Sequence, residues 1–162
     1  MDSIARYLCD DHTRLAALLA RGAVDPAAYA EFRAGLLRHI GMEEKVLLPA
    51  ARRANNGQPL AAAARLRLDH GAIVALLVPS PTPAIRAALR EILEQHNRVE
   101  EGPGGVYELC EQVVGEIADA LLASLRSYPD VPVHPHVDSE SVLDATRRAL
   151  ARAGYSFEVF GV

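Results

Sequence analysis

Apolar residues recur every three to four positions along most of this chain, which is the pattern of amphipathic α-helices. The pattern predicts helices over residues 4–21, 26–55, 59–78 and 83–101, and a further helical segment over 106–127. Because short connections join the long helices, consecutive helices are expected to run antiparallel. The sequence therefore predicts an all-α fold, an up-down-up-down four-helix bundle.

Local chemistry supports several of the predicted helix ends. Ser3, Asp25 and Thr82 have side chains that can cap a helix N-terminus, and Pro26 and Pro83 each stand at a first helical position. The stretch "NNG" at 55–57 is expected to end the second helix, which Pro49 is expected to kink.

The pattern changes after residue 128. Residues 129–138 are Pro-rich and extended, 139–154 have the period of a short amphipathic helix, and 155–162 alternate as a small strand does. We therefore divide the chain into a bundle over 1–128 and a C-terminal extension over 129–162. The extension is expected either to cover one end of the bundle or to pair with another chain and form an oligomer.

An internal repeat links the two halves of the bundle. "DHTRLAALL" at 11–19 resembles "DHGAIVALL" at 69–77. A His followed four residues later by Glu occurs at 39–43 and again at 96–100, at nearly the same offset. The chain is therefore interpreted as two helical hairpins in tandem.

Six side chains of metal-ligand type lie on the inward apolar stripes of the predicted helices. A buried carboxylate is costly unless it is paired or bound to a cation, and each Glu of the set follows a His by one turn on the same face. Any one such His is commonly a satisfied core residue, and a single His-Glu pair is commonly a surface contact. The combination in register predicts a shared metal site formed by His12, His39, Glu43, His70, His96 and Glu100.

This set supplies nitrogen and oxygen donors without a thiolate, which suits Fe, Mn or Zn. It holds too many ligands for one tetrahedral Zn²⁺. We therefore expect two ions, each bound by two histidines and bridged by the two glutamates, with positions left open for a small molecule or an oxo group.

The pattern resembles the hemerythrin-like family, the HHE cation-binding domain. Members use a His from the first helix, HxxxE from the second, a His from the third and HxxxE from the fourth, which here are the six residues above. The resemblance covers about residues 3–128. It implies a non-haem centre of two iron ions, with Mn or Zn as alternatives in the purified protein, carboxylate bridges and an oxo or hydroxo bridge.

Two positions depart from the family pattern. Oxygen-carrying members have a second His one turn after the third-helix His, where this chain has Val74. The remaining set resembles instead the iron–sulfur-repair type of di-iron protein, which is linked to nitrosative stress. The stretch "GPGG" at 102–105 replaces the usual run after the second HxxxE motif and lies beside the predicted metal level.

Neighbouring residues complete the predicted site. Glu44 and Glu101 are expected to point outward, at the solvated edge of their helices, or toward partners that surround the metal ligands. Asp11 and Asp69 are expected either to be exposed or to orient a His on a neighbouring helix. Tyr107, together with Tyr7 on the first helix, is a further candidate near the site.

Charge, hydropathy and cysteine content limit the expected partners and cellular compartment. A formal net charge of −4 argues against nucleic acid as a partner, and no apolar run approaches the roughly 20 residues of a membrane span. The N-terminus lacks the basic start and apolar run of a secretory signal, and two cysteines fit a reducing cytoplasm. We expect a cytoplasmic protein.

Three functions are compatible with this sequence. The first is a di-iron protein that binds oxygen, nitric oxide or peroxide for sensing, stress protection or iron handling. The second is an enzyme that decomposes peroxide or nitric oxide at the same metals, or a donor of iron for iron–sulfur cluster repair. The third is a structural bundle with adventitious metal.

Overall fold

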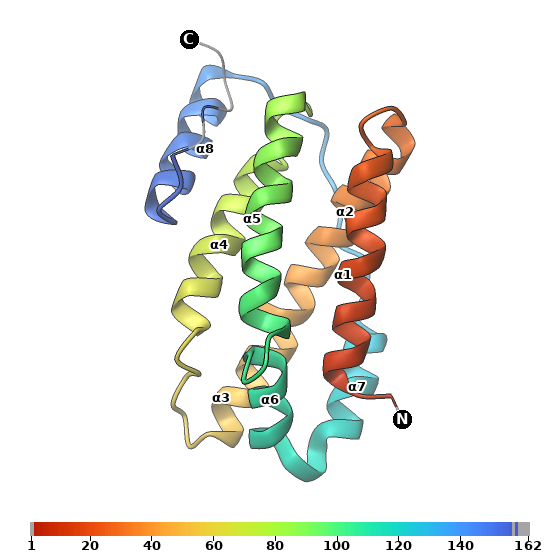
Figure 1. Cartoon of the computed structure of the whole chain (residues 1–162), viewed down its shortest axis with the longest axis vertical. Coiled ribbons are helices and arrows are strands. Elements are labelled where there is room, and N and C mark those ends of the chain that lie inside the picture. Colours follow the sequence, from red (N-terminus) through yellow and green to blue (C-terminus); the bar gives the residue numbers. More distant parts are fainter. Residues whose placement is uncertain (1, 157, 159–162) are drawn as a thin grey trace.

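The computed structural model describes residues 2–156 and 158, and this part of the chain is helical and contains no β-strand. The predicted all-α class is confirmed. The elements, in chain order (Figure 1), are α1 (Ile4–Arg21), α2 (Pro26–Met42), the π-helical turn η1 (Glu43–Leu47), α3 (Leu48–Ala54), α4 (Ala63–Leu76), α5 (Pro83–Glu101), α6 (Val106–Val114), the 3₁₀ turn η2 (Gly115–Ile117), α7 (Ala118–Arg126) and α8 (Glu140–Arg152).

The predicted N-terminal caps are confirmed. The Ser3 side chain accepts a hydrogen bond from the backbone N–H of Arg6, and the Asp25 side chain accepts from those of Ala27 and Ala28. Thr82 caps α5 in the same way. Each bond satisfies a backbone donor that the first helical turn leaves unpaired.

Three predicted helices differ from the observed ones. The second helix is interrupted over Glu43–Leu47 by a π-helical turn, because Pro49 lacks an N–H and its ring excludes the regular bond to the preceding turn. The helix expected from residue 59 begins at Ala63, after irregular structure at 58–60 and a turn at 61–62. The segment 106–127 is broken at Gly115, whose φ is 53°.

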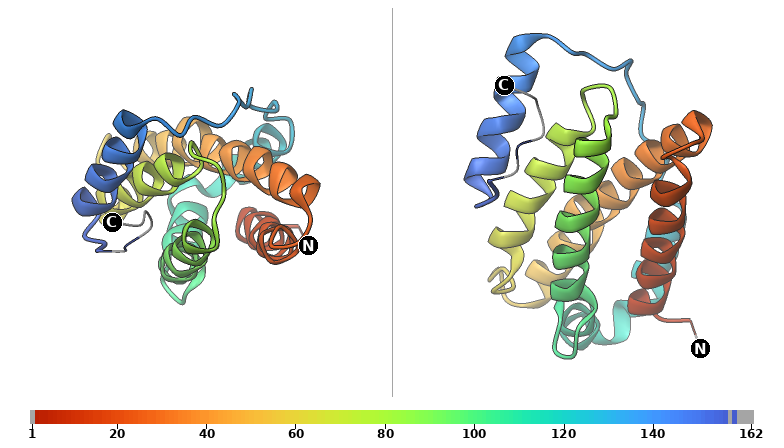
Figure 2. Two further views of the ribbon diagram at one scale, coloured as in Figure 1. Left: turned by 90° about the horizontal axis from the view of Figure 1, so that it is seen from above. Right: turned by 45° about the horizontal axis from the view of Figure 1, so that its top comes forward.

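The long helices α1, α2, α4 and α5 lie side by side, and consecutive ones run in opposite directions (Figures 1 and 2). α1 packs against α2 and α5, and α4 packs against α5. The helices α6 and α7 lie at the end where α1 begins (Figure 1). No helix in the described part of the chain has both the length and the apolar character needed to cross a membrane.

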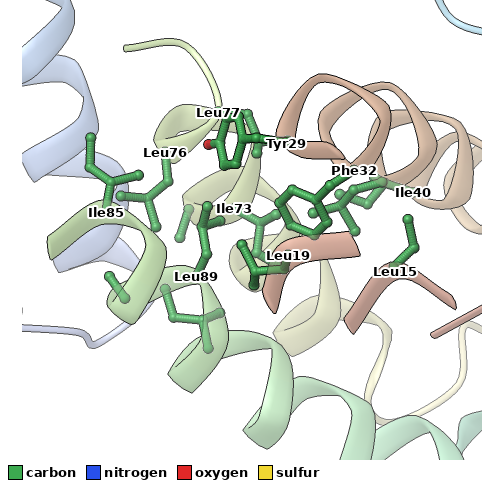
Figure 3. Packing of buried hydrophobic residues seen from close by; sticks show 14 of the residues in the cluster. Leu15, Leu19, Tyr29, Phe32, Ile40, Ile73, Leu76, Leu77, Ile85 and Leu89 are labelled. Carbon is green, nitrogen blue, oxygen red and sulfur yellow. The ribbon is translucent and has the colours of Figure 1, made fainter. Parts of the chain in front are cut away.

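Two apolar clusters fill the space between the long helices. The first contains Phe32, Ile73 and Leu89 among others and is drawn in Figure 3. The second contains Leu8, Leu47 and the side chains that α6 and α7 contribute. Each fully buried Leu or Phe side chain stabilises the fold by about 1.5–3 kcal/mol. The clusters contain residues on both sides of each predicted His, so the His and Glu side chains form a polar layer between them.

The C-terminal extension packs on its own chain. The Arg33 side chain donates hydrogen bonds to the backbone oxygens of Leu77 and His134, each at 2.7 Å, and Asp138 accepts bonds from Ser80. α8 then packs along α4. The extension was expected either to cover one end of the long helices or to pair with another chain; α8 instead lies along the side of α4, and pairing with another chain stays a prediction. The predicted strand over 155–162 lies largely outside the described residues, and residues 155, 156 and 158 are not in a strand.

Candidate metal centre

The six predicted ligand residues meet in one buried layer. Their side chains come from α1, α2, η1, α4 and α5, and none is more than 6% exposed. They form two overlapping groups, and within each group the candidate ligand atoms lie within 4.8 Å of one another. The His12 group consists of His12, His39 and Glu43, and the His70 group consists of Glu43, His70, His96 and Glu100.

Glu43 belongs to both groups. Its Oε1 lies 3.4 Å from His39 Nε2, and its Oε2 lies 3.1 Å from His70 Nε2. The two oxygens of one carboxylate therefore face different groups, which is the placement that a bridging ligand requires.

Glu100 is placed in a corresponding way. Its Oε1 lies 3.0 Å from His96 Nε2, and its Oε2 lies 3.4 Å from His12 Nε2. Within the described part of the chain Oε1 accepts no hydrogen bond of good geometry, although the side chain is fully buried. A buried carboxylate oxygen without such a partner is costly and is suited to a cation.

The π-helical turn η1 begins at Glu43. The backbone N–H of Leu48 donates to the Glu43 oxygen, five residues back instead of four. π-Helical turns inside α-helices are frequent at functional sites. Here the turn starts at Glu43, the candidate ligand that both groups share, and the sequence signal for it is Pro49.

Every histidine of the layer is held at its second ring nitrogen by a carboxylate from another helix. The distances from His Nδ1 to the carboxylate oxygen are 2.5 Å for His12–Glu101, 2.8 Å for His39–Asp11, 2.7 Å for His70–Glu44 and 3.3 Å for His96–Asp69. These four pairs link α1 to α2, η1 to α4, α4 to α5, and α5 back to α1, so they close a ring around the layer.

This ring decides between the roles expected for its four carboxylates. Glu44 and Glu101 each orient a histidine on another helix, and 18% and 36% of their side chains remain exposed. Asp11 and Asp69 follow the second of their two expected roles. Arginines hold three of these carboxylates: Arg14 lies 2.8 Å from Asp11, Arg65 lies 2.9 Å from Asp69, and Arg67 lies 3.4 Å from Glu44.

The ring also determines which nitrogen can bind a metal. A histidine that donates its Nδ1–H to a carboxylate presents the lone pair of Nε2 in its neutral form. All four Nε2 atoms take part in the contacts between imidazoles and buried glutamates within the layer. The arrangement thus has the carboxylate–histidine pairs that orient imidazoles at metal centres.

Electrostatic interactions give the two histidines of the His12 group very different pKa values. Burial opposes protonation of His39, but Glu43 and Asp11 outweigh it and raise the pKa of His39 to about 10. Burial and the charge on His39 lower the pKa of His12 to about 4. The two rings lie 4.5 Å apart, so a proton on one repels a proton on the other.

In the His70 group the same forces act on a carboxylate. Burial and the charge of Glu43 raise the pKa of Glu100 to about 7. Burial opposes ionisation of Glu43 as well, yet His39 and His70 hold its pKa well below the usual range. Close negative charges of this kind favour binding of a cation between them.

Tyr107 enters the layer from α6 and was only loosely indicated by the sequence. Its side chain is 1% exposed, and its hydroxyl donates a hydrogen bond of 2.5 Å to Glu43 Oε1. The hydroxyl oxygen of Tyr107 also lies 3.1 Å from His12 Nε2, 3.3 Å from His39 Nε2 and 3.1 Å from Glu100 Oε2. Burial and the two glutamates raise the pKa of Tyr107 well above its usual value. The predicted neighbour Tyr7 instead contacts Met42.

A cavity of about 510 Å³ leads to the layer between α1 and α5. His12 and Glu101 lie at its polar part. Its apolar lining includes Leu15, Leu19, Leu36 and Leu93. The cavity gives the His12 group a route for a small molecule.

The donor set fits metal ions. Imidazole and carboxylate are ligands for Fe, Mn and Zn, and the buried His and Glu residues could hold an ion in each group. Comparison of the chain with protein-family models, with curated proteins and with solved structures gives no significant match.

Proposed function

We propose that residues 1–128 form an up-down-up-down four-helix bundle of the hemerythrin-like kind that holds two iron ions and binds oxygen, nitric oxide or peroxide. The observation that carries the proposal is the placement of Glu43, whose two carboxylate oxygens face the two histidine groups. The resemblance in the order of His and HxxxE motifs along the chain supports iron over Mn or Zn.

The residues of the chain have separate roles in this proposal. The four histidines would hold the ions through Nε2, Glu43 would be shared by both groups, and Glu100 would serve the His70 group or both. Asp11, Glu44, Asp69 and Glu101 hold the imidazoles at Nδ1. When bound, the two ions would supply open coordination positions and the capacity to donate or accept electrons. The cavity beside His12 offers a small molecule a route to the layer; its lining combines leucines with charged side chains such as Arg90 and Glu101.

Anaerobic addition of ferrous iron tests this function. We expect about two iron ions per chain, because two overlapping groups of donors are present, and a visible spectrum that changes on exposure to oxygen or nitric oxide. Retention of less than about one ion per chain, with no change in His39→Ala, would contradict the proposal. Catalytic loss of added peroxide by the loaded protein would assign turnover in place of binding.

A further inference from the structure

The Tyr107 hydroxyl lies between the candidate ligand atoms of the His12 group. Its oxygen is 2.5–3.3 Å from the candidate ligand atoms of all three members, His12 Nε2, His39 Nε2 and Glu43 Oε1. It also lies 3.1 Å from Glu100 Oε2 of the His70 group. A surface or packing tyrosine would direct its hydroxyl to water or to one partner. This hydroxyl converges with the atoms that would surround an ion.

The loop before α6 brings Tyr107 to this place. The backbone N–H of Gly105 donates to the Gly102 oxygen at 2.7 Å, and Gly104 has a φ of 69°. A Cβ on Gly105 would stand 2.6 Å from the backbone oxygens of both Glu100 and Gly102, so only glycine fits. The "GPGG" stretch thus turns the chain tightly enough for α6 to start at Val106 and for its second residue to reach the layer.

We propose that Tyr107 is itself a metal ligand, binding through its phenol oxygen to the ion of the His12 group. The inference rests on the proposed iron centre and adds a residue to it. As the iron–oxygen bond forms, the O–H bond of Tyr107 breaks and its proton leaves to solvent. No electron is transferred in this step. A phenolate is a hard oxygen donor, of the kind that ferric iron accepts from tyrosine in other proteins.

Completeness of the donor sets supports this assignment. The His70 group has four mutually close residues of metal-ligand type, whereas the His12 group has three. Tyr107 supplies the fourth. In the part of the chain that the structure describes, no tyrosine hydroxyl hydrogen-bonds to His70 or His96 Nε2, so the two ions would differ in their ligands.

Iron-loaded protein exposed to air tests the assignment. A ferric ion bound to phenolate gives a visible charge-transfer band with resonance-enhanced ring vibrations. We expect both in the wild type, and we expect Tyr107→Phe to lose them while it retains helical circular dichroism. Tyr29→Phe is the matched control, because Tyr29 is also buried but lies in the first apolar cluster, and its hydroxyl has no hydrogen-bond partner in the described residues.

Measured iron content keeps this test separate from that of the proposed function. About two ions per chain without phenolate vibrations, or with vibrations that persist in Tyr107→Phe, would overturn the Tyr107 assignment and leave the centre in place. Retention of less than one ion per chain would overturn both. If Tyr107→Phe does not fold, 3-fluorotyrosine at position 107 alone preserves the shape. A band shifted to higher energy supports the assignment, and an unshifted band overturns it.

Discussion

The His12 group and the His70 group arise from similar sequence segments but differ in their surroundings. In the His70 group, the Nε2 atoms of His70 and His96 lie 3.1 Å apart with no side chain between them. In the His12 group, the Tyr107 hydroxyl lies between the imidazoles and both glutamates. A repeat in the spacing of His and Glu therefore does not make two equivalent groups, because different later segments of the chain reach each of them.

The second difference is which distant segment supports each group. α6 contributes Tyr107 to the His12 group, whereas the C-terminal extension supports the His70 group. The Tyr155 hydroxyl donates to Asp69 Oδ1 at 3.0 Å, and Asp69 Oδ2 lies 3.3 Å from His96 Nδ1. Arg65 contacts both Asp69 and the Tyr155 ring.

Loss of the shared carboxylate should have the largest effect. Glu43→Gln keeps the size of the side chain but removes the charge that faces both groups. We expect the iron content to fall to near zero, as measured by elemental analysis after gel filtration. Glu91→Gln, at an exposed position of α5, should keep both ions. Full occupancy in Glu43→Gln would show that the groups do not depend on a shared ligand.

Removal of one histidine from either group should show that the two groups bind their ions independently. His39→Ala removes a donor from the His12 group alone, and His96→Ala removes one from the His70 group alone. Each variant should retain about one ion per chain. The visible phenolate band should disappear in His39→Ala and remain in His96→Ala. Identical spectra of the two variants would contradict the difference between the groups.

A smaller effect is expected from the extension. Tyr155→Phe removes the hydroxyl that holds Asp69, so His96 loses part of its orientation. We expect about tenfold weaker binding of one ion in competition with a chelator, which is the lower end for loss of such outer partners. The phenolate band and the melting temperature should not change. Tyr128→Phe, whose ring lies against Gly41, serves as the control.

The smallest expected effect concerns a thiol beside the His12 group. Burial and the charge of Glu101 raise the pKa of Cys9 to about 11. Because the thiolate is the reactive form, alkylation near neutral pH should be roughly 100-fold slower than for a free thiol. Glu101→Gln should speed it, as mass spectrometry of the modified peptide can measure. Cys110, with a pKa raised to about 12 by burial, should not respond. Equal rates for Cys9 with and without Glu101 would contradict this account.

The convergence of the six candidate ligand residues could be predicted because each lies at helical spacing on an apolar face. His39 and Glu43 share a face whether or not the helix is interrupted after them, so the unexpected π-helical turn did not disturb that prediction. The capping side chains likewise bond to backbone N–H groups only two or three residues further along. Both the caps and the helix faces therefore depend on local sequence, the faces through the 3.6-residue period.

The role of Tyr107 could not be predicted with the same certainty. Its position depends on a loop whose path follows from close backbone contacts at Gly105, not from any period in the sequence. The partners of the Nδ1 atoms depend on how neighbouring helices are rotated, which one helix does not specify. The sequence shows an Asp directly before His12 and His70 and a second Glu directly after each HxxxE motif. Which histidine each of these carboxylates contacts becomes clear only when the helices lie side by side.

The ring of Nδ1 contacts has a mechanical consequence for the four long helices. Each of them both provides an imidazole and, directly or through η1, holds the imidazole of a neighbour. One helical turn is about 5.4 Å, so sliding a helix by one turn along its axis would break two of these bonds at once. The layer therefore fixes the axial register of the helices, and amides in their central turns should become accessible to hydrogen exchange as one cooperative unit.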